Sequence, residues 1–265
     1  MNRPSLKLTE DNYYSLEADS LYMSNSQYKD FIDCEARAMA KLTGWKDPKN
    51  DALLLGSYVH SFFDGTLEKF TAEHPDMFQK NGDLYAKFKH GDVMIQALQQ
   101  DEYCMFALSG QKEVIVTAPF GGVWWKAKID VYTPERGTFS DLKTVKGIRD
   151  KCWVPGYGYT SFMEAYGYLT QMSIYAELER IQVGREEWLE PIVVAVSKED
   201  PPDKEIIGGI EQERIRFEID NVRFNMERII EVKSGREVPI RCERCRYCRE
   251  TKKVNKITHF SRLVV

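Results

Sequence analysis

Two aspartates and a lysine near the middle of the chain have the types and spacing of a metal-dependent hydrolytic site. Asp130 lies near the end of one strand-like run, and Asp141 and Lys143 lie in the next. Because side chains alternate along a strand, Lys143 falls on the same face as Asp141. Carboxylates on neighbouring strands can hold a divalent cation, and an ammonium group beside them can stabilise charge on a phosphate. These residues therefore indicate phosphodiester hydrolysis.

Three further polar residues could join this site, although each also fits an ordinary structural role. His60, flanked by aromatic residues on an expected helix, is more often a packed residue than a ligand, but beside carboxylates its neutral imidazole could bind a metal. Gln171 and Tyr175 lie four residues apart on one helix face. As ordinary structural residues, Gln171 would be an exposed surface residue and Tyr175 would pack in the core. Alternatively, Gln171 could orient Lys143 or a phosphate, and Tyr175 could bond a carboxylate or the scissile phosphate.

The elements that must position these residues follow from periodicity and turn signals. Alternating runs predict a hairpin with a turn at residues 134–137, and an apolar run at 190–197 predicts a central strand. Apolar residues near a 3.6 period predict helices. The first 20 residues are expected to be extended. The expected strands cover residues 113–117, 123–132, 138–144 and 190–197. One expected helix begins at a cap within residues 24–26 and ends at residue 42, and a second begins at a cap at Asp51. Two more cover residues 161–183 and 211–232. Together they predict a mixed α/β core.

The composition sets the class of protein. A chain of 265 residues with 43% hydrophobic content can bury one sizeable core, so we expect one domain over residues 1–265, with a Cys-rich segment at 240–265. The formal net charge of −4 gives no global sign of nucleic-acid binding, so basic groups would have to gather locally. There is no apolar run long enough for a membrane span and no signal-peptide core, and we expect a cytoplasmic protein.

Three of the six cysteines, Cys242, Cys245 and Cys248, form a CxxCxxC cluster. A chain of this size does not need disulfides for stability, so reduced thiols or a metal site are favoured. With a fourth ligand from elsewhere, the cluster could bind zinc or an iron–sulfur cluster. Free thiols are the alternative. Cys104 and Cys152 are interpreted as structural.

The order of these motifs resembles the PD-(D/E)xK nucleases. Asp130 followed by Asp141-Leu142-Lys143 matches their central motif, although Ile129 stands where the motif has proline. Gln171 with Tyr175 matches the QxxxY signature of the RecB-like branch. The runs 56–60 and 141–144 look most like RecE-type phage exonucleases. The resemblance covers roughly residues 24–248 and implies a restriction-endonuclease-like core with a central mixed sheet flanked by helices.

The resemblance also implies a role for each matching residue. His60, Asp130, Asp141 and the Leu142 carbonyl would hold Mg²⁺ or Mn²⁺. Glu113 would bind a second ion or support the first, and Lys143 would be the catalytic lysine. RecB-like nucleases with a cluster take one cysteine from an early helix and three from the C-terminus, which makes Cys34 the candidate fourth ligand. The last cysteine spacing here is shorter than in those enzymes.

RecE-type enzymes degrade one strand of double-stranded DNA from the 5′ end and leave a 3′ overhang for a single-strand annealing protein. They form rings around the duplex, and a homotetramer would be expected here, in a bacterial host or a phage-infected cell. Lys146, Arg149 and Lys151 would then face phosphates. The alternatives are an endonuclease or single-strand nuclease of the same fold, a non-catalytic DNA-binding protein of that fold, and a zinc-ribbon-like interaction module.

Overall fold

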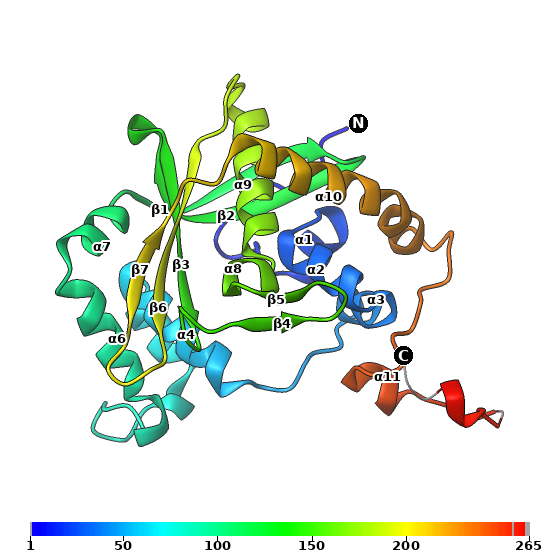
Figure 1. The fold of residues 1–265 in the computed structure, drawn as a ribbon, viewed down its shortest axis with the longest axis horizontal. Coiled ribbons are helices and arrows are strands. Elements are labelled where there is room, and N and C mark those ends of the chain that lie inside the picture. The colour runs from blue at the N-terminus through cyan, green and yellow to red at the C-terminus, as the bar shows by residue number, and fades with distance from the viewer. Residues whose placement is uncertain (1, 256, 263–265) are drawn as a thin grey trace.

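The computed structural model describes residues 2–255 and 257–262, and its centre is a five-stranded mixed sheet (Figure 1). The strand order is β1-β2-β3-β6-β7, and every neighbouring pair is antiparallel except the parallel pair β3 and β6. This confirms the expected α/β class and the central position of the 190–197 strand. The strands are β1 (Gln111–Phe120), β2 (Val123–Thr133), β3 (Thr138–Val145), β6 (Glu190–Ser197) and β7 (Lys204–Ile207), and a separate hairpin comprises β4 (Cys152–Val154) and β5 (Gly158–Thr160).

The predicted β2–β3 hairpin is present, and its turn has the expected chemistry. A 3₁₀ turn at Pro134–Arg136 is followed by Gly137 with φ of 70°, a left-handed conformation that favours glycine. The two strands then pair only from Thr133 with Thr138 to Val131 with Ser140. Beyond that point β2 continues with β1, while β3 continues with β6 (Figure 1). The hairpin therefore opens at Asp130 and Asp141.

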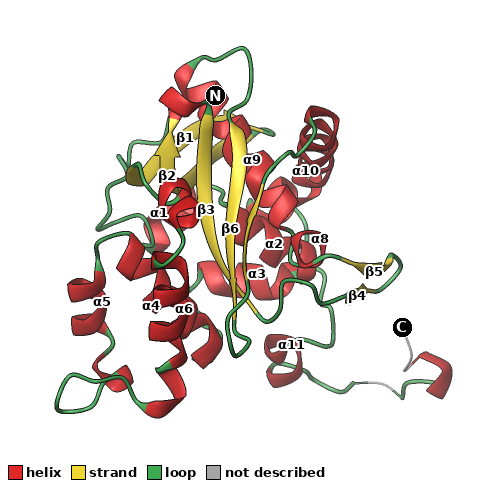
Figure 2. Cartoon of the chain, turned by 60° about the vertical axis from the view of Figure 1, so that its left-hand side comes forward, coloured by secondary structure: helices red, strands yellow, loops and turns green. Residues whose placement is uncertain are grey.

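Helices cover both faces of the sheet and enclose two hydrophobic clusters (Figure 2). The parallel strand β6 is buried on both sides, with Val193 and Ala195 in one cluster and Val194 and Val196 in the other. This alternation is what a central strand requires. One face carries α2 (Asn25–Asp33), α3 (Glu35–Leu42), α9 (Tyr168–Val183) and α10 (Gln212–Lys233), and the other carries α4 (Asp51–Phe63), α5 (Leu67–Glu73), α6 (His90–Gln99) and α7 (Glu102–Ala107).

Two helices that the sequence predicted as continuous are broken. The 24–42 helix begins at the expected cap Ser24 but divides into α2 and α3 at Cys34, whose φ of −165° and ψ of 105° are extended. The 161–183 helix divides into α8 (Phe162–Ala165) and α9 at Gly167, which has φ of 65°. Hydrophobic periodicity predicted one continuous helix in each case, because it shows which side chains are apolar and does not show whether the helical backbone is interrupted.

Two smaller predictions were also wrong, and one strand was not predicted. The segment before Ser20 contains a helix, α1 (Leu16–Leu21), whose N-cap Ser15 accepts a bond from Ala18. Helix α4 is capped by Asn50 and not by Asp51. Strand β7 follows the Pro201–Pro202 break and had no predicted counterpart. None of the described helices is long and apolar enough to cross a membrane.

Candidate active site

Asp130 and Asp141 lie opposite each other where β2 and β3 separate. In place of a ladder hydrogen bond, the Leu142 backbone N–H donates to Asp130 Oδ2 at 3.0 Å. In an extended strand the N–H and C=O of one residue point to the same side, so the Leu142 carbonyl also faces the opened gap. The separation of the strands thus leaves two carboxylates and a backbone oxygen around one space, as the metal-ligand prediction requires.

Asp141 is held from two sides by charged and amide groups. Its side chain is 2% exposed, and Lys143 Nζ lies 2.5 Å from Oδ2. On the other oxygen, Gln171 Nε2 donates to Oδ1 at 2.8 Å. Lys143 also lies over the Tyr168 ring, with Nζ 4.9 Å from the ring centroid. From the sequence, Gln171 was expected to orient Lys143 or a phosphate. In the structure its amide contacts Asp141.

Burial and mutual charge control the protonation of this pair. Burial raises the pKa of Asp141, although Lys143 opposes the shift. Burial by itself lowers the pKa of Lys143, but the negative charges of Asp141 and Asp130 raise it overall. Lys143 is therefore an ammonium at neutral pH. This favours electrostatic stabilisation of charge on the phosphate, as expected for an ammonium beside the carboxylates, over abstraction of a proton from water.

Helix α4 brings His60 to the same space. His60 Nδ1 lies 3.4 Å from Asp130 Oδ2. One turn earlier, Gly56 faces β3 so closely that a Cβ there would lie 2.8 Å from Thr144 Oγ1. Gly56 therefore allows the close packing of α4 on β3 that positions His60, which explains a glycine in a helix interior.

Glu113 lies opposite Asp130 on β1, since Lys112 pairs with Val131 and Val114 with Ile129. Its φ of 54° is left-handed, which is rare for a residue with a side chain and marks a functional or strained position. The Glu113 carboxylate forms an ion pair with Lys128 of β2. Glu113 is thus placed beside the carboxylates, with a lysine as its present partner.

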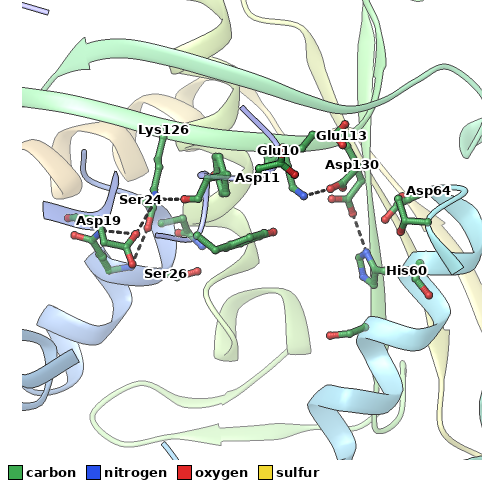
Figure 3. A pocket seen from close by; sticks show the side chains of 18 of the residues that line it. Glu10, Asp11, Asp19, Ser24, Ser26, His60, Asp64, Glu113, Lys126 and Asp130 are labelled. Atoms are coloured by element: carbon green, nitrogen blue, oxygen red, sulfur yellow. Dashed lines mark hydrogen bonds and ion pairs between the residues drawn. The ribbon is translucent and has the colours of Figure 1, made fainter. Parts of the chain in front are cut away.

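His60, Glu113 and Asp130 line a cavity of about 950 Å³ beside the sheet, whereas Asp141, Lys143 and Gln171 do not line it. His60, Asp64, Glu113 and Asp130 face one another at one end of it, and Lys126 and Asp19 lie at the other (Figure 3). Tyr175 also lines it. Burial raises the pKa of Tyr175 well above its usual value, as do Tyr13 and Asp141, so its phenol remains a hydrogen-bond donor.

Sequence reasoning missed several groups at this site. Asp64 follows His60 by four residues on one helix face, a spacing that could have identified it. Burial, with the charge of Asp130, raises the pKa of Asp64 to about 6. Tyr168 precedes Gln171 by three residues and could have been found in the same way. Tyr13 and Tyr14, whose rings lie under Lys128, come from the segment expected to be extended, and no sequence pattern marks them.

The donor set fits a hard divalent cation. Asp141 Oδ2 is buried and makes no hydrogen bond of normal geometry, so it retains a lone pair for a ligand. Mg²⁺ uses one or two carboxylates, a carbonyl and water, and does not need a tight cage of side chains. Asp130, Asp141, the Leu142 carbonyl and His60 would hold it, with Glu113 and Asp64 available nearby.

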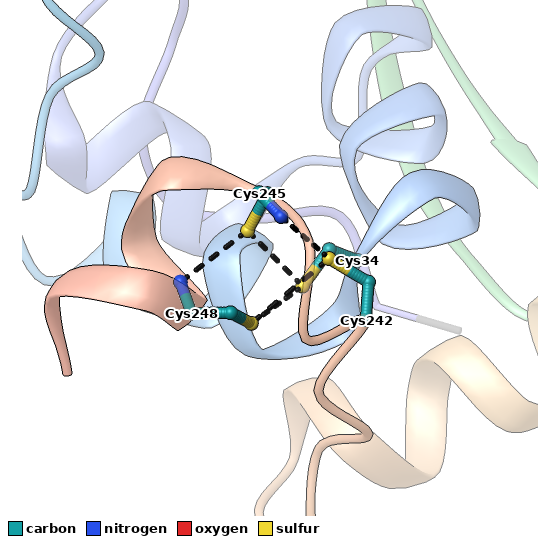
Figure 4. Close-up of side chains that lie close together, drawn as sticks. All are labelled: Cys34, Cys242, Cys245 and Cys248. Atoms are coloured by element: carbon teal, nitrogen blue, oxygen red, sulfur yellow. Dashed lines mark hydrogen bonds between the residues drawn. The ribbon is translucent and has the colours of Figure 1, made fainter. Parts of the chain in front are cut away.

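The four cysteines of the predicted second site come together in the structure (Figure 4). Cys34 lies at the break between α2 and α3, and the other three surround the start of α11 (Arg246–Glu250). Their sulfur atoms all lie within 4.8 Å of one another. His259, the histidine nearest to this cluster in the sequence, is exposed and bonded to Ser261. Tertiary folding thus joins Cys34 to the C-terminal cysteines, as the resemblance implied.

A mixed sheet whose opened hairpin carries Asp130 opposite Asp141-Leu142-Lys143, with Gln171 bonded to that aspartate from a helix behind, defines a member of the PD-(D/E)xK nuclease superfamily. Residues 24–251 match the model of the PDDEXK-like domain of unknown function (DUF3799), and the chain belongs to that family. The match spans both the active-site residues and the four cysteines.

A solved structure, described as a "Putative exonuclease" from Eubacterium rectale, is 39% identical to this chain. The two structures superpose with a TM-score of 0.92 over 98% of this chain and 99% of that one. A second structure, of SSO0001, is 12% identical with a TM-score of 0.30 over 84% of this chain and 91% of that one, which is too distant to carry an argument. None of the curated proteins compared with the sequence matches it.

Proposed function

We propose that this protein is a metal-dependent exonuclease that degrades one strand of double-stranded DNA from the 5′ end and leaves a 3′ single-stranded overhang. The observation that carries the hydrolytic part is the arrangement of Asp130, Asp141 and Lys143 at the opened hairpin, with a buried Asp141 oxygen that has Lys143 beside it but no hydrogen-bond partner. The preference for DNA ends rests on the resemblance to RecE-type enzymes and on the similarity to a structure described as a "Putative exonuclease".

The chain's own residues have distinct tasks in this reaction. Asp130 and Asp141 bind the cation from neighbouring strands, together with His60 from α4, which lies beside Asp130. The Leu142 N–H orients Asp130, and Gln171 orients Asp141. The Lys143 ammonium, held over Tyr168, stabilises negative charge that develops on the phosphate. A bound divalent cation would supply Lewis-acid stabilisation and a more acidic water. No nucleophilic side chain is needed.

Exposed aromatic and basic groups beside the site would contact the DNA. The β4–β5 hairpin projects from the molecule (Figure 2) and exposes Trp153, Tyr157 and Tyr159 by 62%, 74% and 71%. Lys146 and Lys151, just before it, are exposed, while Arg149 pairs with Glu205. Aromatic side chains stack on unpaired bases and lysines attract phosphates, so this hairpin would hold the separated strand.

The wider setting is also part of the proposal. A homo-oligomeric ring, with a tetramer favoured, would enclose the duplex and make digestion processive, and a single-strand annealing protein would take up the overhang for recombination. An endonuclease or single-strand nuclease on the same fold is the alternative, because the site chemistry is shared and only access to the DNA differs.

The test is digestion of linear duplex DNA carrying one blocked 5′ end, in parallel with a closed circle, with Mg²⁺ or Mn²⁺. The expected result is loss of nucleotides from the open 5′ end only, with the circle intact. Asp130→Asn and Lys143→Ala should each reduce the rate at least ~10³-fold, because they remove charge at the reacting phosphate. Glu187→Gln is the control. It changes an exposed carboxylate between α9 and β6, outside the active-site motif, and should retain full activity.

Different outcomes would overturn different parts of the proposal. Cutting of the closed circle at a comparable rate would replace the exonuclease with an endonuclease. Full activity in either active-site variant would reject the site assignment. A monomer in light scattering, with or without DNA, would reject the ring while leaving the hydrolytic site in place.

A further inference from the structure

The four-cysteine group lies outside the active-site cavity and has its own geometry. Cys34 Sγ is 3.6 Å from Cys248 Sγ and 3.8 Å from Cys245 Sγ, and Cys242 Sγ is 4.0 Å from Cys248 Sγ. No pair approaches the length of a disulfide bond, and all four are free thiols. The sulfur atoms therefore form a compact group in which all four lie within 4.8 Å of one another.

These sulfur–sulfur distances have the size that one tetrahedral metal ion requires. A Zn–S distance of about 2.3 Å gives sulfur–sulfur edges of about 3.8 Å in a regular tetrahedron. An iron–sulfur cluster needs a wider arrangement, because its thiolates bind separate irons, four in a [4Fe–4S] cluster and two in a [2Fe–2S] cluster, and the irons and sulfides occupy the centre. We infer that Cys34, Cys242, Cys245 and Cys248 bind a single structural zinc ion and not an iron–sulfur cluster.

Backbone geometry around the cysteines supports metal ligation. The Cys245 N–H donates to Cys242 Sγ at 3.3 Å, and the Cys248 N–H donates to Cys245 Sγ at 3.4 Å. Hydrogen bonds to sulfur favour the thiolate, which is the form that binds metals. Glu243, between the first two cysteines, has φ of 60°. Such strain in a non-glycine residue persists only where the surrounding structure fixes it, as ligation of both flanking cysteines would.

Little else holds this part of the chain in place. Helix α11 has five residues, too few to be stable alone. The buried residues of its hydrophobic cluster are Cys34, Ala36 and Cys248, so the cysteines themselves make most of the contact. A few hydrogen bonds add to it, including Ile240 N–H to Glu35 and Arg241 to the Cys248 carbonyl. Packed thiols without a metal would leave the segment weakly attached.

The zinc ion would therefore join the C-terminal segment to the α2–α3 break and keep that break in its observed shape. Because Cys34 is extended where the sequence pattern is helical, its ligation also explains why the helix is interrupted there. This structural role does not depend on the proposed nuclease activity, since none of the four cysteines lines the active-site cavity as described.

The experiment is metal analysis of the full-length protein, purified without oxygen so that an iron–sulfur cluster would survive. About one zinc per chain is expected, with negligible iron and acid-labile sulfide. Cys245→Ser should lose the zinc. Cys152→Ser, a cysteine outside the group, and Asp130→Ala, in the active site, should both retain it. Should Cys245→Ser fail to fold, cobalt titration of zinc-depleted wild-type protein replaces it, and tetrahedral thiolate coordination should give intense visible bands.

Each outcome decides the inference. Zinc that is lost with Cys245 and retained in both controls, or tetrahedral cobalt bands in the wild type, supports it. Iron with sulfide in the anaerobic protein would replace the zinc ion with a cluster, and zinc lost with Asp130 would assign the metal to the active site. A chain that contains no metal and binds neither zinc nor cobalt would leave four packed thiols and overturn it.

Discussion

Gln171 on α9 donates a hydrogen bond to Asp141 on β3, with 2.8 Å between Nε2 and Oδ1. This contact joins the helix behind the sheet to the carboxylate at the opened hairpin. It fixes one oxygen of a buried side chain and leaves the other beside Lys143 and the space for a cation. From its place on α9, Gln171 therefore positions the carboxylate of Asp141 on β3.

Gln171→Leu should weaken metal binding and should also lower the stability of the fold. The Asp141 carboxylate would lose the Gln171 amide donor while remaining buried, which costs about 1.5–3 kcal/mol for a charged acceptor. Such supporting groups typically change metal affinity by about 10–100-fold. We expect the Mg²⁺ concentration for half-maximal activity to rise by that factor. Gln96→Leu, on exposed helix surface, is the control, and an unchanged Mg²⁺ requirement would show that the contact is incidental.

Gly56→Ala should destabilise the protein, although alanine normally favours a helix over glycine by about 1 kcal/mol. The new Cβ would lie 2.8 Å from Thr144 Oγ1 and push α4 away from β3, moving His60 from Asp130. Thermal unfolding and nuclease rate should both fall. The double variant with Thr144→Ala should recover much of the loss because the colliding oxygen is removed. Stabilisation by Gly56→Ala alone would mean that α4 packs less closely than described.

Trp153→Ala with Tyr159→Ala should weaken binding of single-stranded overhangs without changing stability. Both side chains are exposed and lie on the β4–β5 hairpin, so they support no core. Base stacking is worth about 1–3 kcal/mol per aromatic residue, or roughly 5–150-fold in affinity. Fluorescence anisotropy with overhang DNA measures the change. Tyr103→Ala, equally exposed on α7, should have no effect, and an equal loss there would indicate nonspecific binding.

Lys233 should make part of the stability depend on pH. It bonds the carbonyls of Asp19 and Tyr22 and the Gln27 side chain, and burial, with Lys126 nearby, lowers its pKa from 10.5 to about 8. Between these values the unfolded chain binds a proton that the folded chain has released. Lys233 therefore makes the free energy of unfolding rise with pH across that window. The rise is less than ~1.4 kcal/mol per pH unit because the site is partly exposed.

Comparison of wild type with Lys233→Met isolates this effect. The melting temperature of the wild type relative to Lys233→Met should increase as the pH rises from about 8 toward 10.5, because only the wild type releases the proton. Lys46→Met, an exposed lysine, should show a constant difference across the same range. A flat difference for Lys233 as well would mean that it titrates at its ordinary pKa.

The chain's sequence alone determined the local elements and the identity of the chemical groups. Period-two alternation placed Asp130, Asp141 and Lys143 on paired strands, and the turn at residues 134–137 fixed their hairpin. These features depend on near neighbours in the chain, so a single sequence is enough to predict them. The same local reasoning wrongly predicted two continuous helices, which are interrupted at Cys34 and Gly167, because the spacing of apolar residues does not show where the helical backbone is interrupted.

Only the tertiary structure decided which distant groups meet. The separation of β2 from β3 gave Asp130 the Leu142 N–H, the close packing at Gly56 brought His60 to Asp130, and α9 placed the Gln171 amide on Asp141. Tertiary folding also brought Cys34 within 3.6–3.8 Å of cysteines more than 200 positions later, and these distances are the basis for inferring a single zinc ion where the sequence had left zinc, an iron–sulfur cluster and free thiols open. Such contacts depend on how whole elements pack and on where strands diverge, and these are properties of the folded core as a unit.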